Sequence, residues 1–299
     1  AAMAAARTDI DCAVAYYGVG ITDHLDELEQ VRIPLGFHFG TEDQDCAADI
    51  APIAALAERH DNVSLWMYNK AGHGFANPHR GFFSAAAEEL ARCVGTFGFH
   101  GAMVNGTCQD KFLDDPRYDT LLATAVKLDV PIYIHPSLAP EAVRQTYYSN
   151  LPGSAGVAIE TAGWGWHSET AIHVLRLAYS GALDKHPKLK IIIGHMGEGL
   201  PAMLARIDDV SRPHVRHLKR KVSEAILDQV WITTSGFFTM VPFMAALMTF
   251  GPDRIMFSVD YPFASNARAR AFLDALPVSP ADRAKIAHGN ADRLMRLAT

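Results

Sequence analysis

The chain of 299 residues has little of what disulfide-stabilised, membrane-spanning or nucleic-acid-binding proteins need. Its four cysteines have no Cys-x-x-Cys spacing, which favours reduced thiols in a cytoplasmic protein. No apolar run approaches the length of a membrane span, and the opening AAMAAAR is too short for the apolar region of a signal peptide. The net charge of −6, without a basic run, predicts neither a nucleic-acid nor a membrane partner.

What the chain does have is a regular alternation of short apolar segments with helical segments. This alternation predicts right-handed β–α–β units and a parallel sheet, the pattern of an α/β fold. No linker or low-complexity segment interrupts it. The eight expected strands are 12–17, 33–39, 63–68, 101–105, 131–135, 190–194, 230–234 and 255–260.

The most informative stretch is PKLKIIIGHMGEGLP, residues 187–201. Its three consecutive isoleucines fit a buried parallel strand, and apolar residues at helical spacing follow the glycines. His195 and Glu198 therefore fall in a strand-to-helix loop, with Gly197 and Gly199 allowing a tight turn beside them. Parallel α/β folds place their chemistry at this edge of the sheet.

Four successive expected strands end in polar side chains: His135, His195, the pair Thr234 and Ser235, and Asp260. If these strands are neighbours, the side chains converge over one opening. Two imidazoles and a carboxylate suit Zn²⁺ or Mn²⁺ and can also transfer protons. The long loop 140–166 is rich in glycine and aromatic residues and is typical of a loop that shapes a substrate pocket.

From about Ala85 to Leu297 the chain resembles the amidohydrolase-related, metal-dependent decarboxylases, which include γ-resorcylate and aminocarboxymuconate-semialdehyde decarboxylase. The resemblance rests on LDVPIYIHP, KIIIGHMGEGLP, ITTSG, DRIMFSVDYPF and GNADRLMRL. It implies a (β/α)8 barrel in which His135 and Asp260 bind the metal and His195 acts beside it. Glu198 is implied as a supporting carboxylate with Arg206 as its cationic partner. The family's first-strand ligand pair has no counterpart in this sequence.

Residues 1 to about 82 instead resemble the C-terminal part of a dienelactone hydrolase. The matching segments are AARTDIDCAVAYYGVGI, IPLGFHFGTED and AGHGFANPHR. Asp43 and His73 match the acid and the base of that family's Cys-His-Asp triad. The nucleophile is missing, because neither Gly-x-Cys-x-Gly nor Gly-x-Ser-x-Gly occurs in the chain.

The chain therefore resembles a fusion of residues 1–82 with an amidohydrolase-related segment, 83–299. Three borrowed parallel strands and five barrel strands predict a single TIM-barrel-like α/β domain. The alternatives are two abutting parallel sheets or a poorly ordered N-terminal segment. In the barrel, Asp43 and His73 would share a rim with His135. They would be relics that pair with each other, or else they, or His38 and Glu42 beside them, would partly replace the missing ligand pair. Cys108 would also lie on that rim.

The leading functional hypothesis is a cytoplasmic, metal-dependent, non-oxidative decarboxylase of a hydroxyaryl or related unsaturated carboxylic acid. The resemblance implies that Asp260 delivers the proton and that His195 orients the substrate, with a homo-oligomer as the possible assembly. Trp164, Trp166 and Phe237 either wall the substrate ring or belong to the core. The alternatives are a metal-dependent ester or lactone hydrolase and a catalytically impaired fusion.

Overall fold

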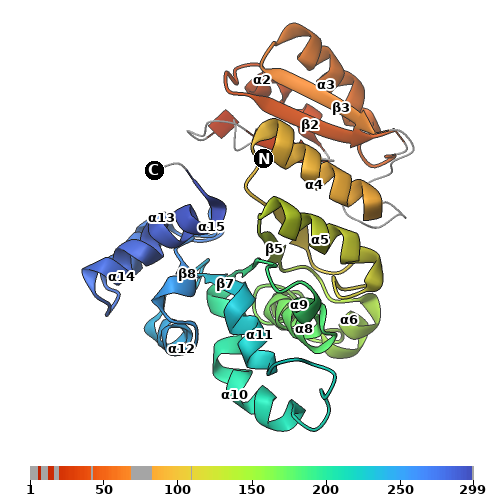
Figure 1. The fold of residues 1–299 in the computed structure, drawn as a ribbon. Helices are drawn as coiled ribbons and strands as arrows, with labels where there is room; N and C mark the ends of the chain where they lie inside the picture. Colours follow the sequence, from red (N-terminus) through yellow and green to blue (C-terminus); the bar gives the residue numbers. More distant parts are fainter. Residues whose placement is uncertain are drawn as a thin grey trace. The chain divides into compact units, whose positions relative to one another are not determined.

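The structure is a computed structural model that describes residues 6–7, 13–16, 20–41, 43–68, 83–108 and 110–297 (Figure 1). The chain divides into two compact units, Ala1–Phe82 and Phe83–Thr299. Each unit is described by itself.

The first unit contains a three-stranded parallel sheet in the order β1-β2-β3. Its elements are β1 (Ala13–Tyr16), the short helices η1 (Ile21–His24) and α2 (Leu25–Leu28), β2 (Leu35–Gly40), α3 (Ala47–Arg59) and β3 (Val63–Tyr68). Every residue of the central strand β2 is buried. Phe37 and Phe39 of that strand pack in a cluster with Ile53 and Leu56 of α3, so the unit has a hydrophobic core of its own.

The second unit contains a five-stranded parallel sheet in the order β4-β5-β6-β7-β8. The strands are β4 (Ala102–Asn105), β5 (Ile132–His135), β6 (Ile191–Ile193), β7 (Val230–Thr233) and β8 (Ile255–Met256). Because each strand pairs with the next strand in the chain, their carboxyl ends follow one another along a single edge.

Helices separate the strands of the second unit and flank its sheet. They are α4 (Phe83–Phe97), α5 (Asp119–Leu128), α6 (Glu141–Tyr147), α7 (Ala155–Glu160), α8 (Gly165–Tyr179), α9 (Ala182–Lys185), α10 (Leu200–Ser211), α11 (Val222–Gln229), α12 (Met240–Phe250), α13 (Asn266–Asp274), α14 (Pro280–Ala284) and α15 (Asn290–Met295). Short 3₁₀ segments are η2 (Pro116–Tyr118), η3 (His195–Gly197) and η4 (Pro252–Arg254), and η5 (Lys285–Gly289) is a π-helical turn.

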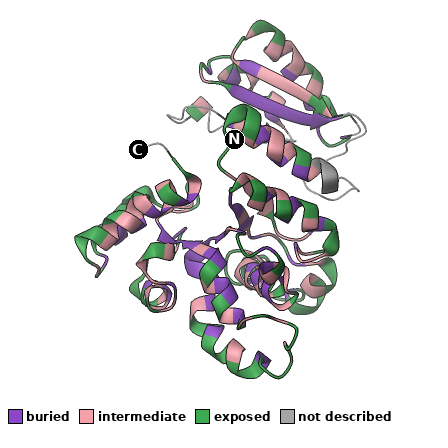
Figure 2. Cartoon of the chain, in the orientation of Figure 1, coloured by how far each residue is buried: buried purple, intermediate pink, exposed green. Residues whose placement is uncertain are grey.

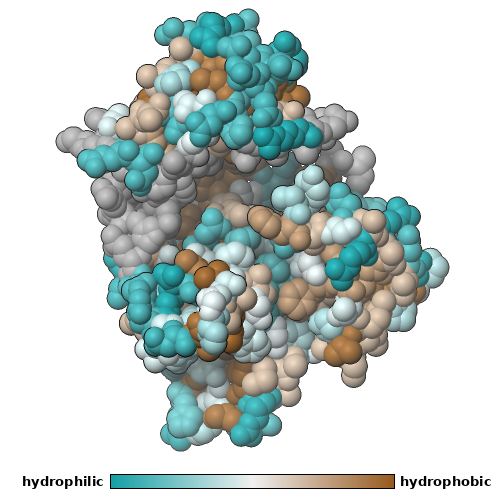
Figure 3. All heavy atoms as spheres, turned by 180° about the vertical axis from the view of Figure 1, so that it is seen from behind, coloured by the Kyte–Doolittle hydropathy of each residue, from teal (hydrophilic) through white to brown (hydrophobic). Residues whose placement is uncertain are grey.

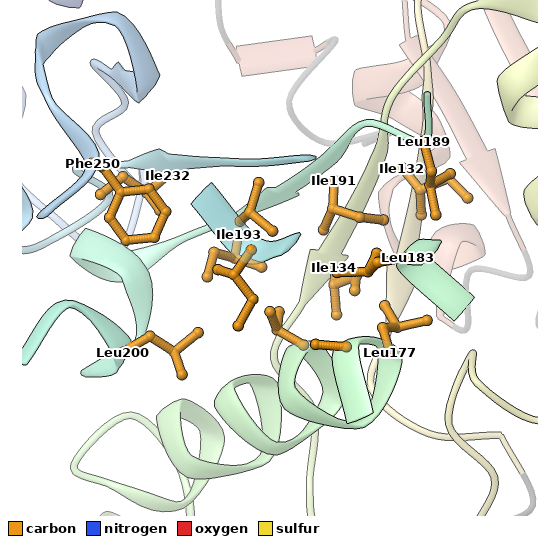
Figure 4. Packing of buried hydrophobic residues seen from close by; sticks show 14 of the residues in the cluster. Ile132, Ile134, Leu177, Leu183, Leu189, Ile191, Ile193, Leu200, Ile232 and Phe250 are labelled. Carbon is orange, nitrogen blue, oxygen red and sulfur yellow. The ribbon is translucent and has the colours of Figure 1, made fainter. Parts of the chain in front are cut away.

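Isoleucines on β5, β6 and β7 form the centre of the second unit's core (Figure 4). Ile132, Ile134, Ile191 and Ile193 are fully buried and pack against Leu177 of α8. Burying one such side chain stabilises the fold by about 1.5–3 kcal/mol relative to its exposure. In Figure 2 the buried colour gathers on the strands and on the inner faces of the helices. This core holds the strand ends, and therefore the residues that follow them, in fixed positions.

Polar residues cover much of the surface drawn in Figure 3, with hydrophobic patches between them. The most exposed large apolar side chains are Val241, Met248 and Phe263. No helix in the described part of the chain is long and apolar enough to cross a membrane.

The sequence correctly predicts all eight strands and their common parallel direction. Within the described residues, β1–β3 and β4–β8 form two separate ladders. The apolar side chains of β1–β3 pack with α3 and the short helices before it, whereas those of β4–β8 pack with α5, α8 and later helices. The joining of all eight strands in one barrel stays a prediction.

His173 of α8 is a buried histidine that makes stability depend on pH. Its Nε2 accepts a hydrogen bond from the Leu113 backbone N–H at 2.9 Å, and the Phe112 ring meets it edge-on. Burial, reinforced by the nearby Arg176 charge, lowers its pKa from 6.5 to about 3. The unfolded chain therefore binds one more proton than the folded chain between these two values, and stability falls as the pH falls through this window.

We expect the His173→Gln variant to lose less stability on acidification than the wild type. Between pH 6.5 and about pH 4.5 the difference should reach about 1–2 kcal/mol, because each pKa unit corresponds to about 1.4 kcal/mol. Denaturant unfolding at a series of pH values measures it. Identical pH slopes for the two proteins would contradict the assignment of a neutral, buried His173.

Candidate active site

Three polar side chains meet beyond the carboxyl ends of β5, β6 and β8. His135 is the last residue of β5, His195 opens η3 directly after β6, and Asp260 follows β8. The rings of His135 and His195 lie 6.4 Å apart between centroids, and His195 Nε2 lies 3.9 Å from Asp260 Oδ2. The structure thus brings together the three residues that the sequence places at neighbouring strand ends.

The loop that carries His195 has an unusual backbone. His195, Met196 and Glu198 have φ angles of 48°, 57° and 55°, and Asp260 has 71°. This left-handed region costs roughly 1–2 kcal/mol for a residue with a side chain. Conformations of this kind persist where the surrounding structure imposes them, and they are concentrated at functional sites. The sequence indicates the tight turn through its glycines, but not the left-handed conformation of His195 and Glu198.

Glu198 binds two imidazoles with its two carboxylate oxygens. Oε1 lies 2.7 Å from His195 Nδ1, and Oε2 lies 2.6 Å from His167 Nδ1. The Glu198 side chain has no exposed surface. A carboxylate buried in this way requires partners for both oxygens, and the two histidines supply them. The polar atoms of these three residues lie within 4.8 Å of one another.

His167 is a site residue that the sequence reasoning missed. It lies near the start of α8, immediately after the aromatic loop that was expected to shape a pocket, and this position is the signal that could have identified it. Burial alone lowers its pKa, but the Glu198 carboxylate and the Ala162 carbonyl raise it more, so the pKa lies above 6.5. Phe237 covers this pair of imidazoles, with ring centroids 5.2 Å from His167 and 6.0 Å from His195.

His135 and Asp260 have the chemistry of metal ligands. The Nδ1–H of His135 donates to the Pro136 carbonyl at 2.7 Å, which leaves the lone pair on Nε2. The Asp260 carboxylate, about one-third exposed, accepts no hydrogen bond from any described residue. One imidazole nitrogen and one uncommitted carboxylate fit a divalent ion such as Zn²⁺ or Mn²⁺.

Hydroxyl groups line the sheet next to these residues. Tyr133 Oη lies 3.4 Å from Thr233 Oγ1, which is 2.7 Å from Ser235 Oγ, and Ser235 donates to Ser258 Oγ at 3.1 Å. Burial raises the pKa of the Tyr133 phenol. This row of neutral hydroxyls joins β5, β7 and the segment after β8 through hydrogen bonds.

Among the described residues, the side chains of Arg206 and the two tryptophans form no hydrogen bond, ion pair or ring contact with the imidazole rings of the site. Arg206 is exposed on α10, and within the described residues it forms no ion pair with Glu198, whose partners are the two histidines. Trp164 is largely exposed at the N-cap of α8. Trp166 is half-buried, and its indole Nε1 is buried without a hydrogen-bond partner in the described structure.

The first unit holds two of the expected relic residues. Asp43 is buried and accepts hydrogen bonds from the backbone N–H groups of Asp45 and Cys46, just before α3. His38 is buried, with Nδ1 2.8 Å from the Tyr68 hydroxyl and its ring stacked on Trp66. His73 and Glu42 lie outside the described residues, so their predicted roles and the shared rim remain predictions.

Cys108 lies in the second unit, after β4, and is buried. Burial raises the pKa of its thiol, which keeps the sulfur protonated at neutral pH. A protonated, buried thiol is a poor nucleophile, so this environment does not favour nucleophilic chemistry at Cys108.

Sequence comparison shows the family to which the chain belongs. The profile of the amidohydrolase family matches residues 47–297, and the chain belongs to this family of enzymes. The γ-resorcylate decarboxylase of Rhodococcus jostii is 41% identical over 226 residues, which cover 71% of this chain and 67% of that protein. The matches to that protein and to two further curated decarboxylases span 66% to 67% of the length of those proteins.

Comparison of structures gives a consistent result. A dihydroxybenzoic acid decarboxylase from Polaromonas, solved with manganese and the inhibitor 2-nitroresorcinol, is 28% identical with a TM-score of 0.69. The alignment covers 97% of this chain and 98% of that one. A shorter match involves a different enzyme: carboxymethylenebutenolidase 1 of Cupriavidus pinatubonensis is 36% identical over 90 residues, 29% of this chain and 37% of that protein.

We expect Gly197→Ala to destabilise the site loop more than Gly199→Ala does. Both glycines have left-handed backbones, with φ of 82° and 79°, so both variants carry the same conformational cost of roughly 1–2 kcal/mol. Only at Gly197 would the new Cβ also meet neighbours, at 3.1 Å from Pro201 Cγ and 3.3 Å from Ile232 Cγ2. Denaturant midpoints measure the difference, and equal midpoints would show that the contact has no effect.

Proposed function

We propose that this protein is a metal-dependent, non-oxidative decarboxylase that acts on a hydroxyaryl carboxylic acid. The observation that carries the proposal is the convergence of His135, His195 and Asp260 at one sheet edge, with Glu198 fixing His195. The similar proteins named above, a γ-resorcylate and a dihydroxybenzoic acid decarboxylase, support the substrate class.

His135 and Asp260 would hold the divalent ion, zinc or manganese. The ion would supply positive charge that stabilises the negative charge of the substrate. The Polaromonas decarboxylase with bound manganese supports this choice of cofactor. The donor set supports it as well, because His135 keeps a lone pair on Nε2 and the Asp260 carboxylate accepts no hydrogen bond from a described residue. With two protein ligands, the affinity should be modest compared with that of a three- or four-ligand site.

The side chains of the site would then move one proton. Asp260, in its protonated form, would give this proton to the ring carbon that bears the carboxylate. The bond from this carbon to the carboxylate carbon breaks, its electron pair returns to the ring, and carbon dioxide leaves. His195, with Nε2 3.9 Å from Asp260 Oδ2, is placed to orient the substrate and, after its Nε2 takes up a proton from solvent, to pass that proton to Asp260. Phe237 would face the substrate ring from the side of His195.

We also propose that residues 1–82 derive from a dienelactone hydrolase. The 90-residue match to carboxymethylenebutenolidase 1 supports this origin, and so does the parallel β1-β2-β3 order of the unit. Asp43 would be a relic of that enzyme's acid, now used to bind the backbone before α3. No role in decarboxylation is assigned to it.

We expect His135→Ala to abolish binding of Mn²⁺ or Zn²⁺, because it removes one of the two side chains assigned as metal ligands. Metal content after dialysis against each ion, measured by atomic emission, tests this expectation. The exposed His217, which binds the Tyr179 carbonyl, provides the control His217→Ala. Unchanged metal stoichiometry in His135→Ala would refute the ligand assignment.

With Mn²⁺ supplied, we expect carbon dioxide release from 2,6-dihydroxybenzoate, and at least a 100-fold lower rate in Asp260→Asn because the proton donor is lost. Measuring carbon dioxide and the phenolic product together separates decarboxylation from the alternative chemistry. Release of acid from an ester or lactone, without carbon dioxide, would favour the hydrolase. No turnover of either substrate class would favour the impaired fusion.

A further inference from the structure

His167 has a hydrogen-bonding environment that fixes its protonation. Nδ1 lies 2.6 Å from Glu198 Oε2, and Nε2 lies 2.9 Å from the Ala162 carbonyl oxygen. A carbonyl oxygen and an ionised carboxylate oxygen both accept hydrogen bonds and donate none. Both ring nitrogens must therefore carry a hydrogen, which makes His167 an imidazolium cation.

The proton in the short contact between His167 and Glu198 belongs on the nitrogen. An imidazole has an ordinary pKa near 6.5 and a glutamic acid one near 4.3, so the imidazole holds the proton more strongly. The Ala162 carbonyl favours the cation further, because it accepts from the second N–H. A negative charge on Glu198 is compatible with a fully buried side chain only because this cation neutralises it.

The second oxygen of Glu198 is then committed to His195. Oε1 accepts from Nδ1 at 2.7 Å, which requires the hydrogen of a neutral His195 to lie on Nδ1. Nε2 is left with its lone pair facing Asp260 Oδ2 at 3.9 Å. The three residues form one relay of hydrogen bonds. The described hydrogen bonds and ring contacts of His167 involve neither His135 nor Asp260, while the charge of the Asp260 carboxylate also raises the pKa of His167.

We propose that His167 is a positioning residue: as an imidazolium, it keeps Glu198 ionised and in place, and Glu198 in turn holds His195 as the Nδ1–H tautomer with Nε2 facing the reacting groups. The catalytic consequence rests on the proposed decarboxylase function. The charge and tautomer assignments do not, because they follow from the contacts alone.

Without His167, one oxygen of Glu198 would be buried without a donor. The carboxylate would then take up a proton or turn away from His195, and either change removes the constraint on the His195 tautomer. A glutamine at position 167 retains a donor for Oε2 but carries no charge, whereas an alanine supplies neither. The effect on His195 should therefore increase from wild type to His167→Gln to His167→Ala.

The test is ¹⁵N NMR of the histidine rings in the full chain at neutral pH, without added metal, with signals assigned through single-histidine variants. We expect wild-type His167 to show two protonated nitrogens and His195 to show one, on Nδ1. In His167→Gln the His195 ring should become a mixture of tautomers. His288→Gln removes an exposed histidine that pairs with Asp292, and it should leave the His195 signals unchanged.

Kinetics with Mn²⁺ and 2,6-dihydroxybenzoate complete the test. Residues that orient a site side chain typically contribute 10- to 100-fold, so kcat should fall by about this factor in His167→Gln, with a smaller change in KM and a larger loss in His167→Ala. A neutral wild-type His167 ring would overturn the proposal even if no variant folds. An unchanged His195 tautomer and kcat in His167→Gln would overturn it as well. If the wild type lacks decarboxylase activity, the proposed function fails while the NMR result still decides the assignment of His167.

Discussion

The buried carboxylate of Glu198 is the interaction on which the site depends. A charge without any exposed surface costs several kcal/mol unless partners neutralise it, and Glu198 has an imidazole on each oxygen. One of these imidazoles comes from the loop after β6 and the other from the start of α8. Two segments about 30 residues apart in the chain are therefore held together by a single carboxylate.

This constraint explains the backbone of the loop. Residues 195–199 follow a left-handed path in which side-chain residues adopt angles normally left to glycine. The path places His195 Nδ1 and Glu198 Oε1, only three positions apart, within 2.7 Å of each other. The strain is maintained by the hydrogen bonds at both oxygens and by the fully buried β6 beneath them.

The sequence predicts the parts of this protein that depend on local pattern. The isoleucine run of β6, the strand pairs in chain order and the polar residues at the strand ends all follow from periodicity and from the general rule about parallel sheets. Two features of the structure cannot be predicted from periodicity or from this rule. Whether three further strands continue a sheet depends on which helices cover their apolar faces, and the strand pattern of β1–β3 does not contain that information. His167 falls at a loop-to-helix junction, where no periodicity distinguishes a site residue from a surface residue.

Arg206 is a second case in which the sequence does not predict the partner of a site residue. Arg206 lies on α10 two residues after Leu204, and Leu200 and Leu204 are buried whereas Arg206 is exposed to solvent. The cation that pairs with the buried Glu198 carboxylate comes from another element instead.

The chemistry of the three imidazoles follows from the atom that each Nδ1 faces. His135 donates to a carbonyl and leaves Nε2 free, and His195 donates to a carboxylate and leaves Nε2 beside Asp260. His167 has acceptors on both sides and no free nitrogen. Three identical side chains thus obtain three different capacities, ligand, proton carrier and fixed cation, from the oxygen atoms around them rather than from their own chemistry.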